Sequence, residues 1–67
     1  KRLSKREQEV MRLVVEGFTT KEISEKLFIS KKTVDNHRAN IMNKLGIHRT
    51  VELIRYAARI GLIDLDA

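Results

Sequence analysis

The sequence contains no cysteine and no proline, and only three of its 67 residues are glycine. Without cysteine, neither disulfides nor thiolate–metal sites can supplement the modest hydrophobic core of so short a chain. The absence of proline and the scarcity of glycine favour helices joined by short turns. No apolar run approaches the roughly 20 residues that span a bilayer, and no signal-peptide pattern is present. We therefore expect no membrane partner and a cytoplasmic location.

Aromatic side chains and catalytic motifs are also scarce. The only aromatic residues are Phe18, Phe28 and Tyr56, too few for a platform that stacks the bases of single strands. The two histidines, His37 and His48, lie on different segments, and the chain has no glycine-rich phosphate loop, H-E-x-x-H motif or metal-spaced carboxylate cluster. We expect neither catalysis nor a cofactor nor a metal.

Positive charge is what the chain has in excess. Fourteen Lys and Arg residues stand against nine Asp and Glu residues, a net charge of +5. On a single domain of residues 1–67 this balance favours a polyanionic partner, with nucleic acid first and an acidic membrane surface second. Because the first residue is Lys rather than Met, we expect a fragment of a longer protein.

Apolar periodicity and cap residues predict an all-α fold with four helices, at residues 5–16, 20–27, 31–45 and 50–60. Ser4 with Glu7, and Thr19 with Glu22, have the S/T-x-x-E spacing of a capping box. Ser30 is a good N-cap for the third helix. Each glycine directly follows an apolar-periodic segment, where helices commonly end. The short link between the second and third helices predicts a helix-turn-helix.

The third helix has two dissimilar faces. Val34, Ile41 and Leu45 form a narrow apolar stripe that would pack inward. The opposite face is polar with one small residue, as reading of the major groove requires, although an ordinary solvated face would look the same. That face holds Lys32, Asp35, Asn36, Ala39, Asn40 and Asn43, preceded by Lys31.

Three residues flank the stripe. His37 is either a helix-packing histidine or a phosphate contact. The stem of Arg38 can pack while its guanidinium reaches a phosphate. Lys44, further along the His37 flank, is either a phosphate contact or a surface lysine without a role.

The fourth helix is apolar on two sides. We expect Val51, Ile54, Ala57 and Ala58 to face the core, with Leu62 and Ile63 folding back behind Gly61. A second strip either caps the edge of the core or makes a two-fold contact between subunits, as in many DNA-binding domains. This strip consists of Leu53, Tyr56 and Ile60.

The chain resembles the LuxR/NarL-type helix-turn-helix domain of bacterial response regulators and quorum-sensing activators. The resemblance covers nearly the whole chain and lies in the joint spacing of its motifs. It runs through Leu3, Ser4, Arg6-Glu7, Val10, Gly17, Lys21-Glu22-Ile23, Leu27, Ile29-Ser30, Lys32-Thr33-Val34, His37, Asn40-Ile41, Lys44-Leu45-Gly46, Glu52 and Ala57.

The resemblance implies four helices, dimerisation through the fourth, and binding of double-stranded DNA at paired half-sites beside promoters. RNA polymerase is a further expected partner. The family's base-facing positions fall on Asp35, Asn36 and Ala39, which the helical wheel also places outward. Its phosphate contacts fall on Lys32, Thr33, His37 and Lys44, and we add Lys31, Arg38 and Asn40.

The chain departs from the family pattern at three places. Ser24 stands where alanine is usual, and Asp35 is acidic at a base-reading position. Arg49-Thr50 stands where a small capping residue followed by Arg is common, so the start of the fourth helix is expected to differ. Two rival functions are a helical protein-interaction module and a sigma-factor-like promoter-recognition domain. The exposed polar side of the third helix counts against the first, and the presence of a fourth helix counts against the second.

Overall fold

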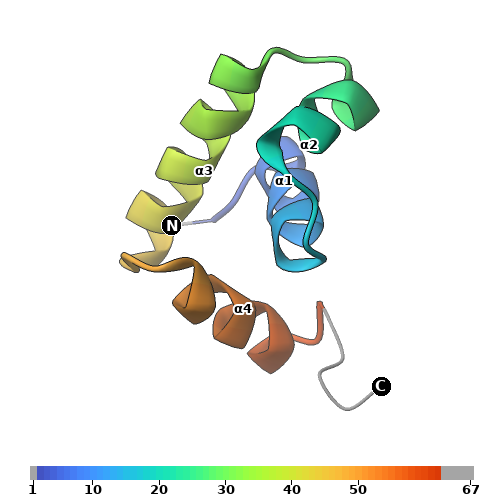
Figure 1. Cartoon of the computed structure of the whole chain (residues 1–67). Coiled ribbons are helices and arrows are strands. Elements are labelled where there is room, and N and C mark those ends of the chain that lie inside the picture. Colours follow the sequence, from blue (N-terminus) through green and yellow to red (C-terminus); the bar gives the residue numbers. More distant parts are fainter. Residues whose placement is uncertain (1, 63–67) are drawn as a thin grey trace.

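A computed structural model describes residues 2–62 and contains four helices within that range (Figure 1). They are α1 (Lys5–Val15), α2 (Thr20–Leu27), α3 (Lys31–Leu45) and α4 (Thr50–Arg59). No strand occurs in the part of the chain that is described. The all-α prediction is confirmed, and each predicted helix boundary lies within one residue of the observed one. α1 contacts each of the other three helices, and α4 lies across one end of the α1–α3 pair.

The two predicted capping boxes set the starts of α1 and α2. At α1, the Glu7 amide donates to Ser4 Oγ (3.1 Å) and the Ser4 amide donates to Glu7 Oε1 (2.8 Å). At α2, Thr19 and Glu22 make the same reciprocal pair at 3.1 and 2.8 Å. At both starts the two partners lie three residues apart, so the spacing in the sequence is enough to predict the capping box.

α4 starts without a capping hydroxyl. Arg49 is its N-cap and makes no side-chain capping bond, so Glu52 supplies only the second half of a capping box. Glu52 Oε1 accepts from the amides of His48 (2.9 Å) and Arg49 (3.1 Å). One carboxylate thereby fixes the backbone that links α3 to α4.

The turn between α2 and α3 is held by a left-handed residue. Phe28 adopts φ 58° and ψ 44°, a region that glycine occupies at less cost, and its side chain is 94% exposed. The Ile29 amide donates to the Ser24 carbonyl (3.0 Å), and the Ile29 side chain packs against the core. The turn directs one apolar residue inward and leaves the other in solvent, and Ser30 then caps α3 with its Oγ 3.0 Å from the Thr33 amide.

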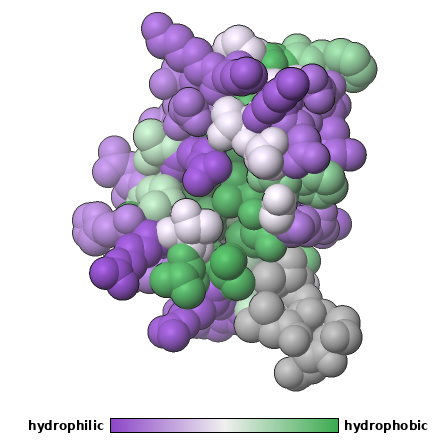
Figure 2. Space-filling model, in the orientation of Figure 1, coloured by the Kyte–Doolittle hydropathy of each residue, from purple (hydrophilic) through white to green (hydrophobic). Residues whose placement is uncertain are grey.

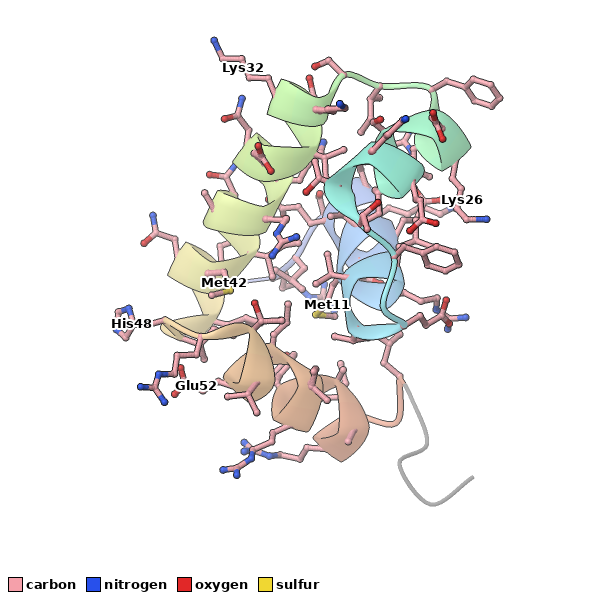
Figure 3. The ribbon with its side chains drawn as sticks, viewed as in Figure 1. Met11, Lys26, Lys32, Met42, His48 and Glu52 are labelled. Atoms are coloured by element: carbon pink, nitrogen blue, oxygen red, sulfur yellow. The ribbon has the colours of Figure 1, made fainter. Side chains whose placement is uncertain are left out.

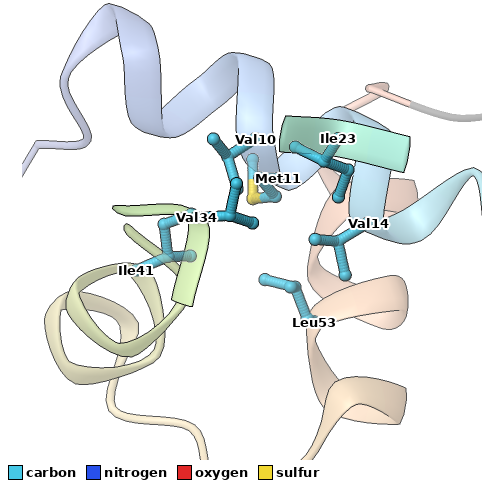
Figure 4. Close-up of a cluster of buried hydrophobic side chains, with 7 residues drawn as sticks. All are labelled: Val10, Met11, Val14, Ile23, Val34, Ile41 and Leu53. Atoms are coloured by element: carbon cyan, nitrogen blue, oxygen red, sulfur yellow. The ribbon is translucent and has the colours of Figure 1, made fainter. Parts of the chain in front are cut away.

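Every helix contributes to one hydrophobic core (Figure 4). The α3 stripe behaves as predicted at Val34 and Ile41, which are fully buried, while Leu45 packs half-buried at its edge. In α1, Met11 is buried in the core itself, whereas Leu13 lies at the periphery. The buried cluster consists of Val10, Met11, Val14, Ile23, Val34, Ile41 and Leu53.

The predicted inward face of α4 was wrong at Val51 and right at Ala57, and the second strip turns part of its length to the core. Leu53 is 3% exposed and belongs to the core, whereas Val51, expected inside, is 49% exposed. Ala57 is buried as expected, and Tyr56 packs against the core. Leu53 is therefore not available to a second subunit, and of the expected dimerisation strip only Ile60, 51% exposed, offers a large accessible surface.

The reason is that α4 has apolar residues on two sides, so its periodicity does not say which side faces inward. Behind α4, the Leu62 amide donates to the Ala57 carbonyl (2.8 Å) and Leu62 packs on the core, as predicted. Ile63, predicted to do the same, lies outside the described residues.

The observed orientation of α4 gives a direct test on stability. We expect Leu53→Ala to lower the free energy of unfolding by about 2–5 kcal/mol, since it removes buried methyl groups and leaves a cavity. Val51→Ala, the matched control, should change it by no more than about 0.5 kcal/mol, as a surface substitution does. Urea denaturation followed by circular dichroism measures both. A larger loss for Val51→Ala than for Leu53→Ala would show that the predicted orientation was right.

Candidate nucleic-acid interface

α3 turns its polar face away from the other helices. Val34 and Ile41 are buried on the inner side, so the residues half a turn away project outward. In Figure 3, Lys32 and His48 project on the outer side of α3 and its following turn, whereas Lys26 of α2 points to the opposite side of the molecule. The exposed residues of this outer face are Lys31, Lys32, Asp35, Asn36, Ala39, Asn40 and Asn43.

The three expected base-facing residues are all exposed on this face. Asn36 and Ala39 have no neighbouring helix over them. Asp35 is different, because Thr20 Oγ1, in the first turn of α2, donates to Asp35 Oδ1 at 3.5 Å, the outer limit of a hydrogen bond. Asp35 therefore stands where α2 and α3 converge. Thr20 was not found from the sequence, since the contact joins residues 15 apart in the chain.

The expected phosphate contacts gather at the N-terminal end of α3. Lys31 and Lys32 are exposed, and Thr33 is half-buried. The hydroxyls of Ser30 and Thr33 lie 2.8 Å apart, so the start of the helix presents two coupled hydroxyl groups beside two ammonium groups. Unpaired helix-terminal amides and these cations together favour a bound anion at this end.

The flanking residues divide into two kinds. Asn40 is exposed on the outer face, whereas His37 and Arg38 are half-buried beside the apolar stripe. This placement leaves both readings of His37 open, because a half-buried ring can pack and still present one nitrogen to solvent.

Lys44 does not lie free on the surface. Its Nζ is 2.7 Å from Glu7 Oε1 and donates to the Arg2 carbonyl at 3.4 Å. The Glu7 side chain is 6% exposed and that of Lys44 is 30% exposed. The hydrogen bond from Lys44, aided by the Ser4 amide, holds the pKa of the Glu7 carboxyl below its usual range. Neither sequence alternative for Lys44 included this partner, which lies 37 residues away.

Ser24, one of the residues that depart from the family pattern, is buried in α2. Its Oγ donates to the Lys21 carbonyl of its own helix at 2.7 Å. The Ser24 hydroxyl therefore has its hydrogen-bond acceptor within α2 and needs no partner from α3.

Residues 2–62 contain no group of three or more His, Cys, Asp or Glu side chains arranged to hold a metal ion. Nor does any described helix combine the length and the apolar character that crossing a bilayer requires.

A family model described as "Bacterial regulatory proteins, luxR family" matches residues 1–57. The chain belongs to this family. Its members are helix-turn-helix DNA-binding transcription regulators and not enzymes. The suspected resemblance is therefore confirmed, with a match that covers α1, α2, α3 and most of α4.

Individual relatives agree with the family assignment. The chain is 48% identical over 62 residues to the oxygen regulatory protein NreC of Staphylococcus aureus, which covers 92% of this chain and 29% of NreC. The DNA-binding domain of the RcsB protein of Erwinia amylovora is 39% identical, covers all of this chain and 77% of that one, and has a TM-score of 0.85. A structure of two RcsB dimers bound to two parallel DNAs is 43% identical, with a TM-score of 0.82 over 87% of this chain and 29% of that one. The chain thus spans less than a third of the length of NreC.

The Glu7–Lys44 contact predicts how stability depends on pH. Because the pKa of Glu7 is lower in the folded state than its unfolded value of about 4.3, the stabilisation is complete above that value. It is lost as the pH falls through the lower, folded pKa. We expect the free energy of unfolding to drop more steeply between about pH 5 and pH 3 in the native chain than in Glu7→Gln.

Urea denaturation at several pH values measures this difference. Glutamine keeps an oxygen that can accept from the Ser4 amide but cannot be ionised. Glu22 and Glu52, whose pKa values are also lowered, are unchanged in the variant and serve as an internal control. Parallel pH curves for the two proteins would contradict a stabilising role for the ionised Glu7.

Proposed function

We propose that this chain binds double-stranded DNA sequence-specifically and regulates transcription, with α3 in the major groove. The observation that carries the proposal is the two-sidedness of α3. Val34 and Ile41 bury its inner face in the core. Apart from Asp35, which Thr20 of α2 contacts, the polar outer face lies clear of the other helices. A helix presented in this way fits the width of the major groove.

The outer face suggests which residues read bases. The amide of Asn36 can make a bidentate pair with the N6 and N7 edge of adenine. Ala39 cannot hydrogen-bond, but its methyl group can contact that of thymine or allow close approach. Asp35 can accept from the amino group of cytosine, and its tie to Thr20 limits where the carboxylate reaches.

Phosphate contacts position the helix without reading sequence. The positive N-terminal end of α3 would contact the phosphates on one side of the major groove. The remaining polar residues would contact phosphates further along the helix. The proposed contacts are Lys31, Lys32, Thr33, His37, Arg38 and Asn40. We leave out Lys44, whose ammonium group is engaged with Glu7.

We also propose that the domain binds as a dimer through α4, but by a strip other than the expected one. Since Leu53 and Ala57 face inward, the opposite side of α4 presents Val51, flanked by the half-exposed Ile54 and Ala58. Figure 2 shows hydrophobic surface over α4, below the mainly hydrophilic surface over α2 and the start of α3. An apolar strip on one helix can pair with its own copy about a two-fold axis, as paired half-sites require.

The wider setting follows from the relatives. NreC is an oxygen regulatory protein, and this chain corresponds to less than a third of it, so we propose that the chain is the output domain of a response regulator. Such a domain would act in the bacterial cytoplasm at promoters, with RNA polymerase as a further partner.

Separate substitutions distinguish reading from positioning. We expect Lys32→Ala to weaken binding to every duplex alike and to reduce the salt slope, log K against log salt, by about 0.9, because one phosphate contact is lost. Asn36→Ala should leave that slope unchanged and cost about 1–3 kcal/mol at a preferred site only. Fluorescence anisotropy with selected and scrambled duplexes at several salt concentrations measures both effects. Identical changes in the two variants would refute the division of roles.

The dimer proposal is tested on α4. We expect Val51→Asp to abolish cooperative occupation of paired half-sites, lowering affinity for the pair about fivefold or more while leaving single half-site affinity unchanged. Ile60→Asp is the matched control, since Ile60 is equally exposed but lies about 180° round the helix from Val51. Gel-shift titration on one and two half-sites separates the outcomes. Loss of cooperativity in the Ile60 variant alone would assign the contact to the other strip.

A further inference from the structure

One acidic side chain is buried at the junction of α1 and α3. Within residues 2–62, Glu7 and Ser24 are the only polar residues in the buried class, and of the two only Glu7 carries a charge. Removing a carboxylate from water costs free energy unless a charge or several donors replace the water. Glu7 has both kinds of replacement, one from the adjacent Ser4 amide and one from Lys44, which is 37 residues away along the chain.

The same oxygen joins three parts of the chain. Glu7 Oε1 accepts from the Ser4 amide at 2.8 Å and from Lys44 Nζ at 2.7 Å. Lys44 Nζ also donates to the Arg2 carbonyl at 3.4 Å. The segment at residues 2–4, the first turn of α1 and the last turn of α3 are thus tied at one point.

This tie constrains α3 in a way that the core does not. Aliphatic contacts such as those of Val34 and Ile41 hold α3 against α1 but are non-directional, so they tolerate small rotations and shifts. A charged hydrogen bond is directional and short. Placed one residue from the C-terminal end of α3, it opposes rotation of that helix about its own axis. Such a rotation would swing Asn36, Ala39 and Asn40 relative to the rest of the domain.

We propose that Glu7 and Lys44 are a positioning pair for DNA recognition, which fixes the angle at which α3 presents its outer face and couples that angle to residues 2–4. The inference rests on the proposed function, because it concerns how α3 meets the groove. It assigns Lys44 to Glu7 and not to a DNA phosphate. It also implies that a shift of the backbone at residues 2–4 would be passed to α3 through Glu7 and Lys44.

The experiment compares Lys44→Met, Glu7→Gln and the double variant with the native 67-residue chain. Methionine keeps much of the lysine stem without the ammonium group, and glutamine keeps the cap acceptor without the charge. Lys26→Met is the matched control, since it removes the same charge from a lysine that points to the other side of the molecule (Figure 3). The probes are a duplex selected from a random library by the native chain and a scrambled duplex of the same composition.

We expect both single variants to lower the ratio of selected to scrambled affinity by about three- to tenfold, and the double variant to do no worse than the larger single effect. The salt slopes should stay unchanged. The loss in Glu7→Gln is the sharpest outcome, because this variant loses a negative charge and would bind DNA more tightly if net charge alone mattered. Lys44→Arg, which can still reach the carboxylate, should keep most of the ratio, and Lys26→Met should keep all of it.

Two results would overturn the proposal. If Lys44→Met alone loses affinity, for both duplexes and with a salt slope reduced by about 0.9, Lys44 contacts a phosphate. If both variants lower only the thermal midpoint and leave the ratio intact, the pair is purely a stabilising contact. Binding is measured at a temperature where each variant has native helicity, and if Lys44→Met never reaches it, Glu7→Gln and Lys44→Arg decide. Failure of the native chain to prefer any duplex would instead reject the proposed function itself.

Discussion

The packing of two aliphatic side chains of α3, Val34 and Ile41, is the contact on which the rest of this domain depends. They lie seven residues apart, so both fall on one side of the helix, where they pack in the same buried cluster as Val10 of α1 and Ile23 of α2. A 67-residue chain without disulfides has little other means of holding a long helix in place. Because these two residues face inward, everything half a turn away must face outward. The polar face of α3 is therefore a consequence of the core.

The ends of α3 need separate constraints, since burial of a central stripe leaves a helix free to tilt. At the N-terminal end, the left-handed Phe28 and the Ser30 cap fix where α3 starts, and Thr20 of α2 reaches Asp35. At the C-terminal end, Lys44 is held by Glu7. The N-terminal end carries Lys31 and Lys32, which are exposed and suited to phosphate. The C-terminal end carries Lys44, whose ammonium group is already paired with Glu7. Lysines at the two ends of one helix thus have different electrostatic surroundings, which the net charge of the chain does not reveal.

These differences explain what the sequence could predict. Helix boundaries were predictable because Ser4 with Glu7 and Thr19 with Glu22 are contacts between residues close in sequence, and such contacts leave a fixed spacing. The outer face of α3 was predictable because a single apolar stripe defines its opposite. The orientation of α4 was not, since either Leu53 or Val51 could face the core by periodicity alone. The Glu7–Lys44 contact was not either, because a pairing across 37 residues leaves no local pattern.

The orientation of α4 joins the stability of the domain to its proposed assembly. Leu53 belongs to the core while Val51, on the same turn, stays in solvent, so one ten-residue helix closes the core and offers the apolar strip. Fixing the inner side through Leu53 also fixes the outer side, which makes the strip a rigid surface with little entropy to lose on pairing. A partner that binds this strip binds only the folded helix and therefore stabilises the core by mass action. DNA bound to α3, as proposed, would stabilise the same core through Val34 and Ile41. Since both surfaces depend on one small core, occupation of either one favours the folded state that the other requires.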